Sequence, residues 1–249
     1  RISRLDDPDP VPRSAYEGPL IVLVNRYSAS ASEIFAAAIQ DYGRGIIVGQ
    51  QTFGKGTVQN LYPLDQYVRN SDDEGLGQIT LTIGKYYRVT GESTQNRGVA
   101  PDIELPSYID VSSTGESARK TALPWDTIRS SSFKKEGSIK DTIVTLQANH
   151  EKRKAIDPYL IFLTEDIEAA NNNRAKKLVS LNKIKRTEER ELSLENRKKR
   201  EDKRNSSINK IGNSDPEIND NNEGTDEDID IQLNEAAAIA ADIVFLSNT

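Results

Sequence analysis

The sequence contains no cysteine, no methionine and a single histidine, His150. The absence of cysteine excludes disulfides, thiolate catalysis and cysteine-based metal sites. A single histidine cannot build a multi-histidine metal site, and because His150 stands in a charged stretch we predict that it is a surface residue. Because methionine is absent, Arg1 is not an unprocessed translation start, and we expect further sequence before it.

Long apolar runs are also absent, and acidic residues outnumber basic ones. No apolar stretch approaches the ~20 residues of a membrane helix, which predicts no membrane span in this piece. The formal net charge of −6 argues against nucleic acid as the main partner. Apolar residues make up 35% of the chain and charged residues 29%, so we expect part of the chain to lie outside any core.

The N-terminal part of the chain has the pattern of an α/β core. Residues 19–24 form a continuous apolar run, typical of a strand buried on both faces. Residues 28–42 are rich in alanine with apolar residues at helical spacing, and residues 46–49 have the pattern of the next strand. This strand–helix–strand unit indicates an α/β fold. We expect further strands at residues 57–61 and 78–89 and in the proline-flanked edge segment 101–106.

The composition changes after residue 106 and suggests a second, mainly α-helical part. We divide the chain into a core at 1–106, a linker at 107–138, a helical C-terminal domain at 139–204, a disordered segment at 205–228 and a terminal helix at 229–249. The segment 205–228 is rich in Asn, Asp and Ser, a composition that cannot bury a core. Within the linker, Leu123-Pro124-Trp125 is the expected docking point.

Serine residues stand where the first predicted helix begins. The N-terminus of a helix presents unpaired backbone N–H groups and the positive end of the helix dipole. Such groups can hold the oxyanion of a tetrahedral intermediate, so Ser28, Ser30 and Ser32 are candidate nucleophiles. Ser30 and Glu33 also fit an S-x-x-E capping box. The pattern alone favours capping over catalysis.

A serine nucleophile needs a base, and Lys55 is the candidate. It stands between Gly54 and Gly56, which permit close backbone contact and could press the side chain into a dry pocket. Burial favours the neutral form of an amine. A neutral Lys55 could take the proton of Ser30 and return it to the leaving amine. From the pattern alone, a lysine on a glycine turn without a catalytic role is the simpler interpretation.

Several ordered motifs together resemble a known family. They are residues 24–34 (VNRYSASASEI), 41–44 (DYGR) and 52–59 (TFGKGTVQ), and they closely resemble the tail-specific, or C-terminal processing, serine peptidases. The similarity continues through 86–89, 93–95, 98–103 and 122–126 and is still recognisable in 167–181. The matching order and gaps make this signal more specific than any single short motif.

The resemblance assigns roles to individual residues. It implies that Ser30 is the nucleophile of a Ser–Lys dyad, Lys55 is its base, and Gln59 orients the lysine amine. The Ala31 backbone N–H would be one oxyanion donor. Asp41 matches an aspartate often counted with the active region, and we expect a structural role for it, because a carboxylate beside the base would oppose proton removal. No metal or other cofactor is implied.

The resemblance also implies a setting. The fold would be crotonase-like, an α/β (α+β) core with a mixed sheet followed by a mainly α-helical C-terminal domain. Substrates would be proteins with apolar, unstructured C-termini, cut in the periplasm during processing of cell-envelope proteins, with an envelope lipoprotein as a possible adaptor. An export signal, a PDZ domain and a glycine-rich strand with the second oxyanion donor are expected upstream of Arg1. The piece alone is then expected to be inactive.

The sequence leaves two rival interpretations open. One is a catalytically inactive module of the same fold that binds protein tails or acts as a scaffold. The other makes the basic run 197–204 a nucleic-acid contact. Because no aromatic residues interleave with this run, we favour a solvated helix face with i,i+4 pairs around Glu191, Glu195 and Lys199.

Overall fold

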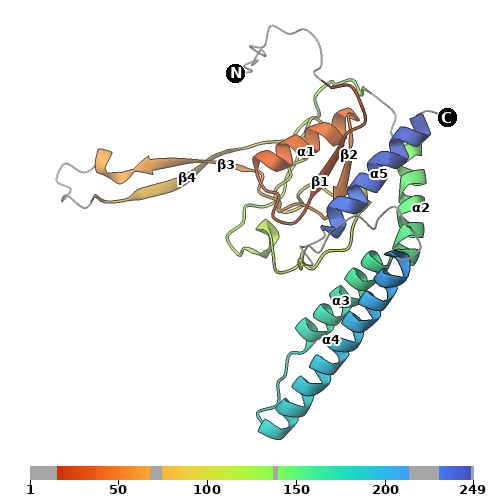
Figure 1. Cartoon of the computed structure of the whole chain (residues 1–249). Coiled ribbons are helices and arrows are strands. Elements are labelled where there is room, and N and C mark those ends of the chain that lie inside the picture. Colours follow the sequence, from red (N-terminus) through yellow and green to blue (C-terminus); the bar gives the residue numbers. More distant parts are fainter. Residues whose placement is uncertain (1–15, 68–74, 137–139, 213–229, 248–249) are drawn as a thin grey trace.

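The computed structural model describes residues 16–67, 75–136, 140–212 and 230–247 (Figure 1). Its elements follow in chain order: β1 (Ile21–Val24), α1 (Ala31–Tyr42), β2 (Ile46–Gly49), β3 (Thr57–Pro63), the short 3₁₀ helix η1 (Leu64–Gln66), β4 (Gln78–Lys85), β5 (Ile103–Glu104), the 3₁₀ helix η2 (Glu116–Ala118), α2 (Lys140–Ile156), α3 (Pro158–Ala175), α4 (Lys183–Gly212) and α5 (Ile231–Ser247). Helices and strands are therefore mixed, with the strands in the N-terminal part.

A parallel three-stranded sheet in the order β1-β2-β5 lies at the centre. Ile21 pairs with Ile46, and Val48 pairs with Ile103. Parallel neighbours cannot be joined by a tight hairpin. Helix α1 therefore crosses from β1 to β2, and Gly43 ends it in the left-handed conformation with φ 69°. The predicted strand–helix–strand unit is confirmed, and β5 lies at an edge, as its flanking prolines predict.

Helices cover both faces of this sheet. Successive side chains of a strand point to opposite faces. Ile47 accordingly packs against α1, whereas Ile46 and Val48 pack against α2 and α5. The buried cluster on the second face consists of Ile46, Val48, Ile103, Leu105, Leu146, Ala236 and Ile239. Helix α5 therefore shares a core with strands that lie far from it in the sequence.

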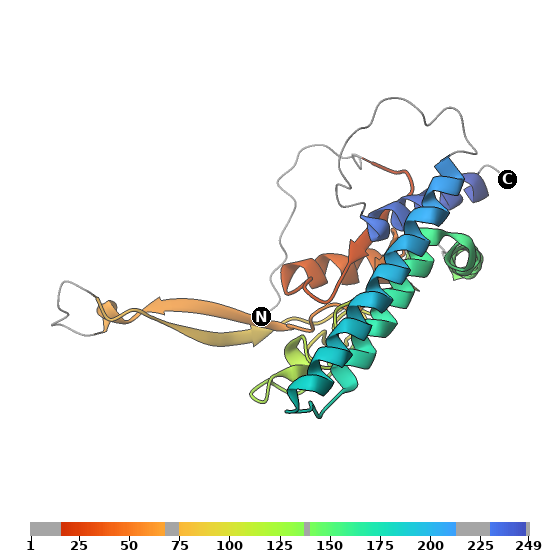
Figure 2. The same cartoon turned by 60° about the horizontal axis from the view of Figure 1, so that its bottom comes forward.

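The antiparallel pair β3–β4 leaves the sheet and projects as a long hairpin (Figures 1 and 2). We expected one mixed sheet, but the described strands form a parallel sheet and a separate hairpin. Just before β3, the N–H groups of residues 54–56 bind buried side chains and not a neighbouring strand. Strand β1 also differs from the predicted strand buried on both faces: it lies at an edge among the described strands, and only Val24 of it is buried.

Helices α3 and α4 lie side by side and extend away from the sheet (Figure 1). The structure continues α4 to Gly212, so residues 205–212 are helical although we expected disorder there. The rest of that expected segment, 213–228, lies outside the described residues. Within the described ranges, no helix combines the length and the apolarity that crossing a bilayer requires.

His150 is buried, so its prediction as a surface residue is wrong. Only 1% of the residue is exposed, and Nδ1 lies 2.8 Å from Oε1 of Glu235 on α5. Glu151 and Lys152 are exposed, whereas His150 lies on the side of α2 that packs against α5, as does Arg153, which binds Glu235 and Asp242. The partner of His150 stands 85 positions away, which is why the local pattern was misleading.

The linker docks through the predicted tripeptide. The indole Nε1 of Trp125 donates to the Ser93 carbonyl at 2.8 Å, and the guanidinium of Arg97 lies 3.5 Å from the ring centroid. The carbonyl of Leu123 accepts from the side chains of Gln95 (3.1 Å) and Asn96 (3.0 Å). Residues 123–125 are thereby held against the loop 93–97, whose Gln95 and Asn96 in turn bind the backbone next to Lys55.

Candidate active site

Ser30 occupies a strained turn between β1 and α1. Its φ of 57° and ψ of −113° lie in a region that residues other than glycine rarely adopt. Such a conformation costs about 1–3 kcal/mol and is found most often at functional sites. A sharp, strained strand-to-helix turn is also how α/β-hydrolases expose their nucleophilic serine. Ser30, which is half-buried, lies in such a strained strand-to-helix turn.

Glu33 joins the turn at Ser30 to the loop that contains Lys55. The predicted capping box is present, and Oε2 of Glu33 accepts from the Ser30 N–H at 2.9 Å. The same oxygen accepts from the Lys55 N–H at 2.8 Å. Oε1 accepts from the Gly54 N–H at 2.6 Å and from the Thr52 hydroxyl at 2.5 Å. One fully buried carboxylate therefore fixes both segments relative to each other.

The backbone around Lys55 is held at every N–H group. Besides the two bonds to Glu33, the Gly56 N–H donates to Oε1 of the buried Gln95 at 2.9 Å. The Gly54 carbonyl accepts from the Asn96 N–H at 2.8 Å. A Cβ on Gly56 would lie 2.7 Å from the Gln95 nitrogen, so the glycine is required by close packing. The side chain of Lys55 is half-buried and starts from a rigid loop.

Arg26 connects its own segment with two others through hydrogen bonds of its side chain. It is 1% exposed, and its guanidinium donates to the carbonyls of Thr52 and of Thr114, the latter at 2.7 Å. Burial lowers the pKa of Arg26, while the negative charge of Glu33 opposes this shift. Gly115 adopts φ 112°, and a Cβ there would lie 2.4 Å from the guanidinium, so only glycine fits.

Asp41 lies at the C-terminal end of α1 and pairs with Arg88. Its carboxylate accepts from Nη2 at 2.6 Å and from Nε at 3.0 Å, and the residue is 6% exposed. A two-point arginine–carboxylate contact is a strong and directional interaction. This contact joins α1 to the segment after β4 and favours the structural role expected for Asp41.

Ala31 and Gln59 have different surroundings. Among the residues that the structure describes, the Ala31 N–H has no hydrogen-bond acceptor, as befits the first turn of a helix. Gln59 is exposed on β3, and its Nε2 donates to the Thr82 hydroxyl at 3.3 Å. Within the described residues no hydrogen bond joins Gln59 to Lys55. The structure thus brings Ser30, Ala31 and the Lys55 loop together but places Gln59 on the hairpin.

Sequence reasoning missed three buried residues that build the site. Glu33 was identified as a helix cap, but the pattern gave no sign of its contacts with residues 52–55. Arg26 and Gln95 are buried polar residues whose partners lie tens of positions away. Their only signal was that each falls within a motif of the family resemblance.

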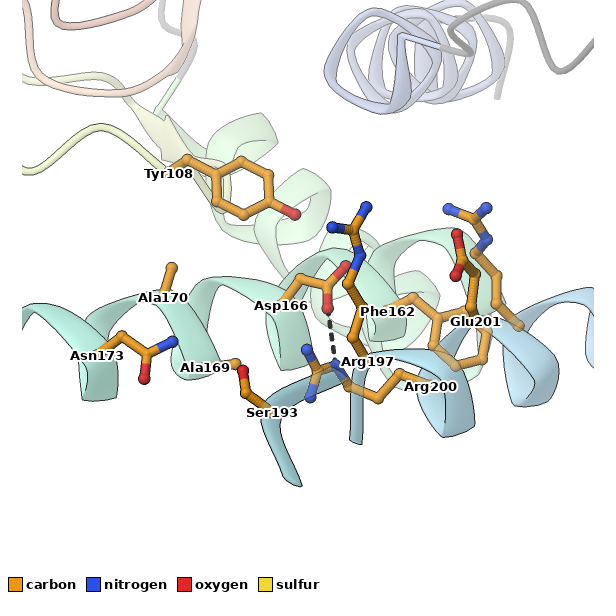
Figure 3. Close-up of a pocket in the computed structure, with 11 residues that line it drawn as sticks. Tyr108, Phe162, Asp166, Ala169, Ala170, Asn173, Ser193, Arg197, Arg200 and Glu201 are labelled. Atoms are coloured by element: carbon orange, nitrogen blue, oxygen red, sulfur yellow. Dashed lines mark hydrogen bonds and ion pairs between the residues drawn. The ribbon is translucent and has the colours of Figure 1, made fainter. Parts of the chain in front are cut away.

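Three of the six basic side chains in the run 197–204 on α4 pair with acidic side chains. Lys199 pairs with Glu195 at 2.7 Å, and Arg200 pairs with Asp166 of α3 at 2.9 Å. Figure 3 shows the second pair beside a cavity of about 370 Å³ between these helices. Lys203 pairs in turn with a carboxylate of α3. These contacts favour a helix face that carries ion pairs over a surface for nucleic acid.

Comparison with known proteins places two family models on the chain. The model of peptidase family S41 matches residues 3–105, the part that holds Ser30 and Lys55. The model of the C-terminal domain of tail specific protease matches residues 109–244. The two matches together cover almost the whole chain in the order that the resemblance implies.

Individual relatives agree with these models. The chain is 48% identical over 170 residues to a tail-specific protease of Haemophilus influenzae, which covers 67% of this chain and 24% of the relative. It is 47% identical over 87 residues to a carboxy-terminal-processing protease of Bartonella bacilliformis, covering 35% of this chain and 18% of the relative. A solved photosystem II D1 C-terminal processing protease is 37% identical, with a TM-score of 0.30 over 37% of this chain and 22% of that one. The chain thus spans about a quarter or less of the length of these relatives.

Proposed function

The chain belongs to the tail-specific protease family of serine peptidases, and from this membership we propose that it supplies the nucleophile, Ser30, and the general base, Lys55. The observation that carries the proposal is the shared carboxylate of Glu33, which binds the backbone N–H of both residues. A strained serine and a clamped lysine loop, fixed by one buried group, have the rigidity that a catalytic pair requires.

In the proposed reaction, the Ser30 hydroxyl attacks the carbonyl carbon of the scissile peptide bond. Lys55, in its neutral form, takes the hydroxyl proton and passes it to the leaving amine, so that an acyl-enzyme forms and water later hydrolyses it. The Ala31 N–H, which has no acceptor among the described residues, donates to the oxyanion. A second donor comes from the part of the protein that this chain does not include.

We further propose that the substrates are proteins with apolar, unstructured C-termini. The support comes from relatives named for tail-specific or carboxy-terminal processing. The setting is the bacterial periplasm, where the enzyme processes cell-envelope proteins, with a lipoprotein adaptor as a candidate partner. The catalytic core is crotonase-like. Upstream segments provide the PDZ domain and the glycine-rich oxyanion strand.

The full-length protein tests the assignment of the dyad. A substrate with an apolar C-terminal tail is incubated with wild type, Ser30→Ala and Lys55→Ala, and kcat/KM is compared with that for a substrate with a charged tail. We expect either substitution to lower kcat/KM by at least 10³-fold, because a nucleophile and its base act as a unit. Cleavage that continues after Lys55→Ala would remove Lys55 as the base. Tail binding without cleavage in wild type would instead support an inactive binding module.

Gln59 needs a separate test, because its hydrogen bond in the structure goes to Thr82. If Gln59 orients the Lys55 amine, Gln59→Ala lowers kcat at least tenfold and leaves KM nearly unchanged. Thr82→Ala, the control, removes the observed hydrogen bond and leaves kcat unchanged. Equal effects of the two variants would show that Gln59 serves only the hairpin.

A further inference from the structure

The segment that contains η2 packs against the loop that contains Lys55. The Glu116 N–H donates to the Phe53 carbonyl at 2.9 Å, and the guanidinium of Arg119 lies 5.4 Å from the centroid of the Phe53 ring. Residues 116–119 lie beyond residue 105, where the match to the peptidase model ends. A part of the chain outside the peptidase model therefore contacts the loop that supplies the proposed base.

Glu116 also reaches this loop through the side chain of Gln95. Glu116 is 7% exposed and Gln95 is fully buried. Oε1 of Glu116 accepts from Nε2 of Gln95 at 3.3 Å, and the Leu123 carbonyl accepts from the same nitrogen at 3.1 Å. At the other end of the amide, Oε1 of Gln95 accepts from the Gly56 N–H at 2.9 Å. Each end of the Gln95 amide thus has a defined partner.

These contacts determine which end of the Gln95 amide faces Gly56. A side-chain amide has one oxygen that accepts hydrogen bonds and one NH₂ group that donates them. A flipped amide would turn its oxygen towards the oxygens of Glu116 and Leu123, and its NH₂ group towards the Gly56 N–H. Both ends would then face groups of the same kind. Glu116 therefore supplies one of the two acceptors that hold the amide in its observed orientation.

The Gly56 N–H belongs to the peptide plane that follows Lys55. The Lys55 N–H belongs to the plane that precedes it, and this group donates to Oε2 of Glu33 at 2.8 Å. Because peptide units are planar, the two planes that flank a Cα atom set its φ and ψ, and with them the direction of the Cα–Cβ bond. Glu33 holds the first plane and Gln95 holds the second. The direction of the Lys55 side chain thus depends on both contacts.

Stability of the fold explains the carboxylate of Glu116 less well than the contact with Gln95 does. Its Oε2 is buried and accepts no hydrogen bond among the described residues. This oxygen lies 3.9 Å from Nη1 of Arg119, whose side chain is 62% exposed. A buried carboxylate with such a partner contributes little net stability, because the cost of desolvation offsets the attraction.

We propose that Glu116 is a positioning residue for Lys55. It acts through Gln95, whose fixed amide holds the peptide plane after Lys55 and so directs the lysine amine towards Ser30. The inference rests on the proposed Ser30–Lys55 dyad. It gives the part of the chain beyond the peptidase model a role in orienting the base.

Two substitutions of Glu116 in the full-length protein separate reach from charge. Glu116→Gln loses the charge but keeps an oxygen that can accept from Gln95, whereas Glu116→Asp keeps the charge but is shorter by one methylene and loses the contact. We expect Glu116→Asp to lower kcat for a tail-bearing substrate by about fivefold or more with KM within about twofold, because the lost hydrogen bond acts on the base and not on substrate binding. Glu116→Gln should keep kcat within about twofold of wild type. The reverse order, or equal kcat for the two variants, would overturn the proposal.

Hydrogen exchange gives a readout that does not depend on cleavage. The Gly56 amide should exchange faster in Glu116→Asp than in Glu116→Gln, because its acceptor on Gln95 is held less firmly. Equal exchange rates would contradict the route through Gln95. Glu92→Asp makes the same shortening at an exposed position and should change neither kcat nor exchange.

The Lys55→Ala variant distinguishes failure of this inference from failure of the proposed function. Cleavage that continues in Lys55→Ala would refute the dyad, and the positioning role would fall with it. Loss of cleavage in Lys55→Ala, together with wild-type kcat in Glu116→Asp, would refute the positioning role alone.

Discussion

Replacing Glu33 by glutamine should loosen the catalytic pair without removing either catalytic side chain. The carboxylate accepts four hydrogen bonds, two at each oxygen. An amide offers one oxygen and one NH₂ group, so one side of the new residue must face its neighbours as a donor. The best orientation places the amide oxygen towards Ser30 and Lys55, because the Thr52 hydroxyl can rotate and accept from the NH₂ group.

In that orientation only the Gly54 N–H is left facing a donor. An unsatisfied buried N–H costs about 1–3 kcal/mol, and the two remaining backbone bonds lose their charge assistance. We therefore expect Glu33→Gln to lower the free energy of unfolding by about 1–3 kcal/mol. Because each 1.4 kcal/mol of lost transition-state stabilisation is a tenfold change in rate, kcat should also fall at least tenfold.

Urea denaturation and steady-state cleavage of a tail-bearing substrate measure the two effects in the full-length protein. Glu92→Gln, at an exposed position, is the matched control and should change neither quantity. A free energy of unfolding within about 0.5 kcal/mol of that of wild type, together with a kcat within about twofold, would show that the Glu33 carboxylate does not fix Ser30 and Lys55 relative to each other.

Three further predictions concern strain, packing and charge. Ser30→Gly should be more stable than Ser30→Ala by about 1 kcal/mol in chemical denaturation, because only glycine adopts the positive φ without strain; equal stabilities would refute the strain. Gly115→Ala should lower the free energy of unfolding by roughly 3 kcal/mol or more, since its Cβ would collide with the Arg26 guanidinium, and an unchanged melting temperature would contradict this. Burial raises the pKa of Glu235, but the contacts with His150 and Arg153 outweigh it and lower the pKa. The ionised carboxylate therefore contributes stability above its unfolded pKa of about 4.5, and this contribution is lost as the pH falls below that value. Glu235→Gln should therefore flatten the acid limb of a plot of stability against pH, and an unaltered limb would rule out this contribution.

The sequence predicted those features that depend on neighbours along the chain. The apolar run before Ser30, the alanine-rich helix after it and the capping box with Glu33 are all local patterns, and each is present in the structure. The prolines around β5 correctly placed it at an edge. The backbone constraints on Lys55 were visible as two flanking glycines, although their reason, the proximity of Gln95 and Asn96, was not.

Features that depend on distant partners could not be predicted in this way. His150 stands among charged residues, and nothing in its own segment indicates that Glu235 of α5 approaches it. Arg26 likewise gave no sign of burial, because its partners at Thr52 and Thr114 come from separate loops. The hairpin β3–β4 has an ordinary strand pattern, which does not tell whether its strands join the parallel sheet or form a separate pair.

The packing of α2 and α5 on the sheet limits where this chain can be divided into independent parts. The boundary between the two family models falls between residues 105 and 109, yet Leu146, Ala236 and Ile239 lie in one cluster with Ile46 and Ile103. Evolutionary modules and folding units therefore do not coincide here. Separating the chain at this boundary would expose apolar surface on both fragments. Exchanging one half between relatives would require compatible side chains at the contacts between the two halves.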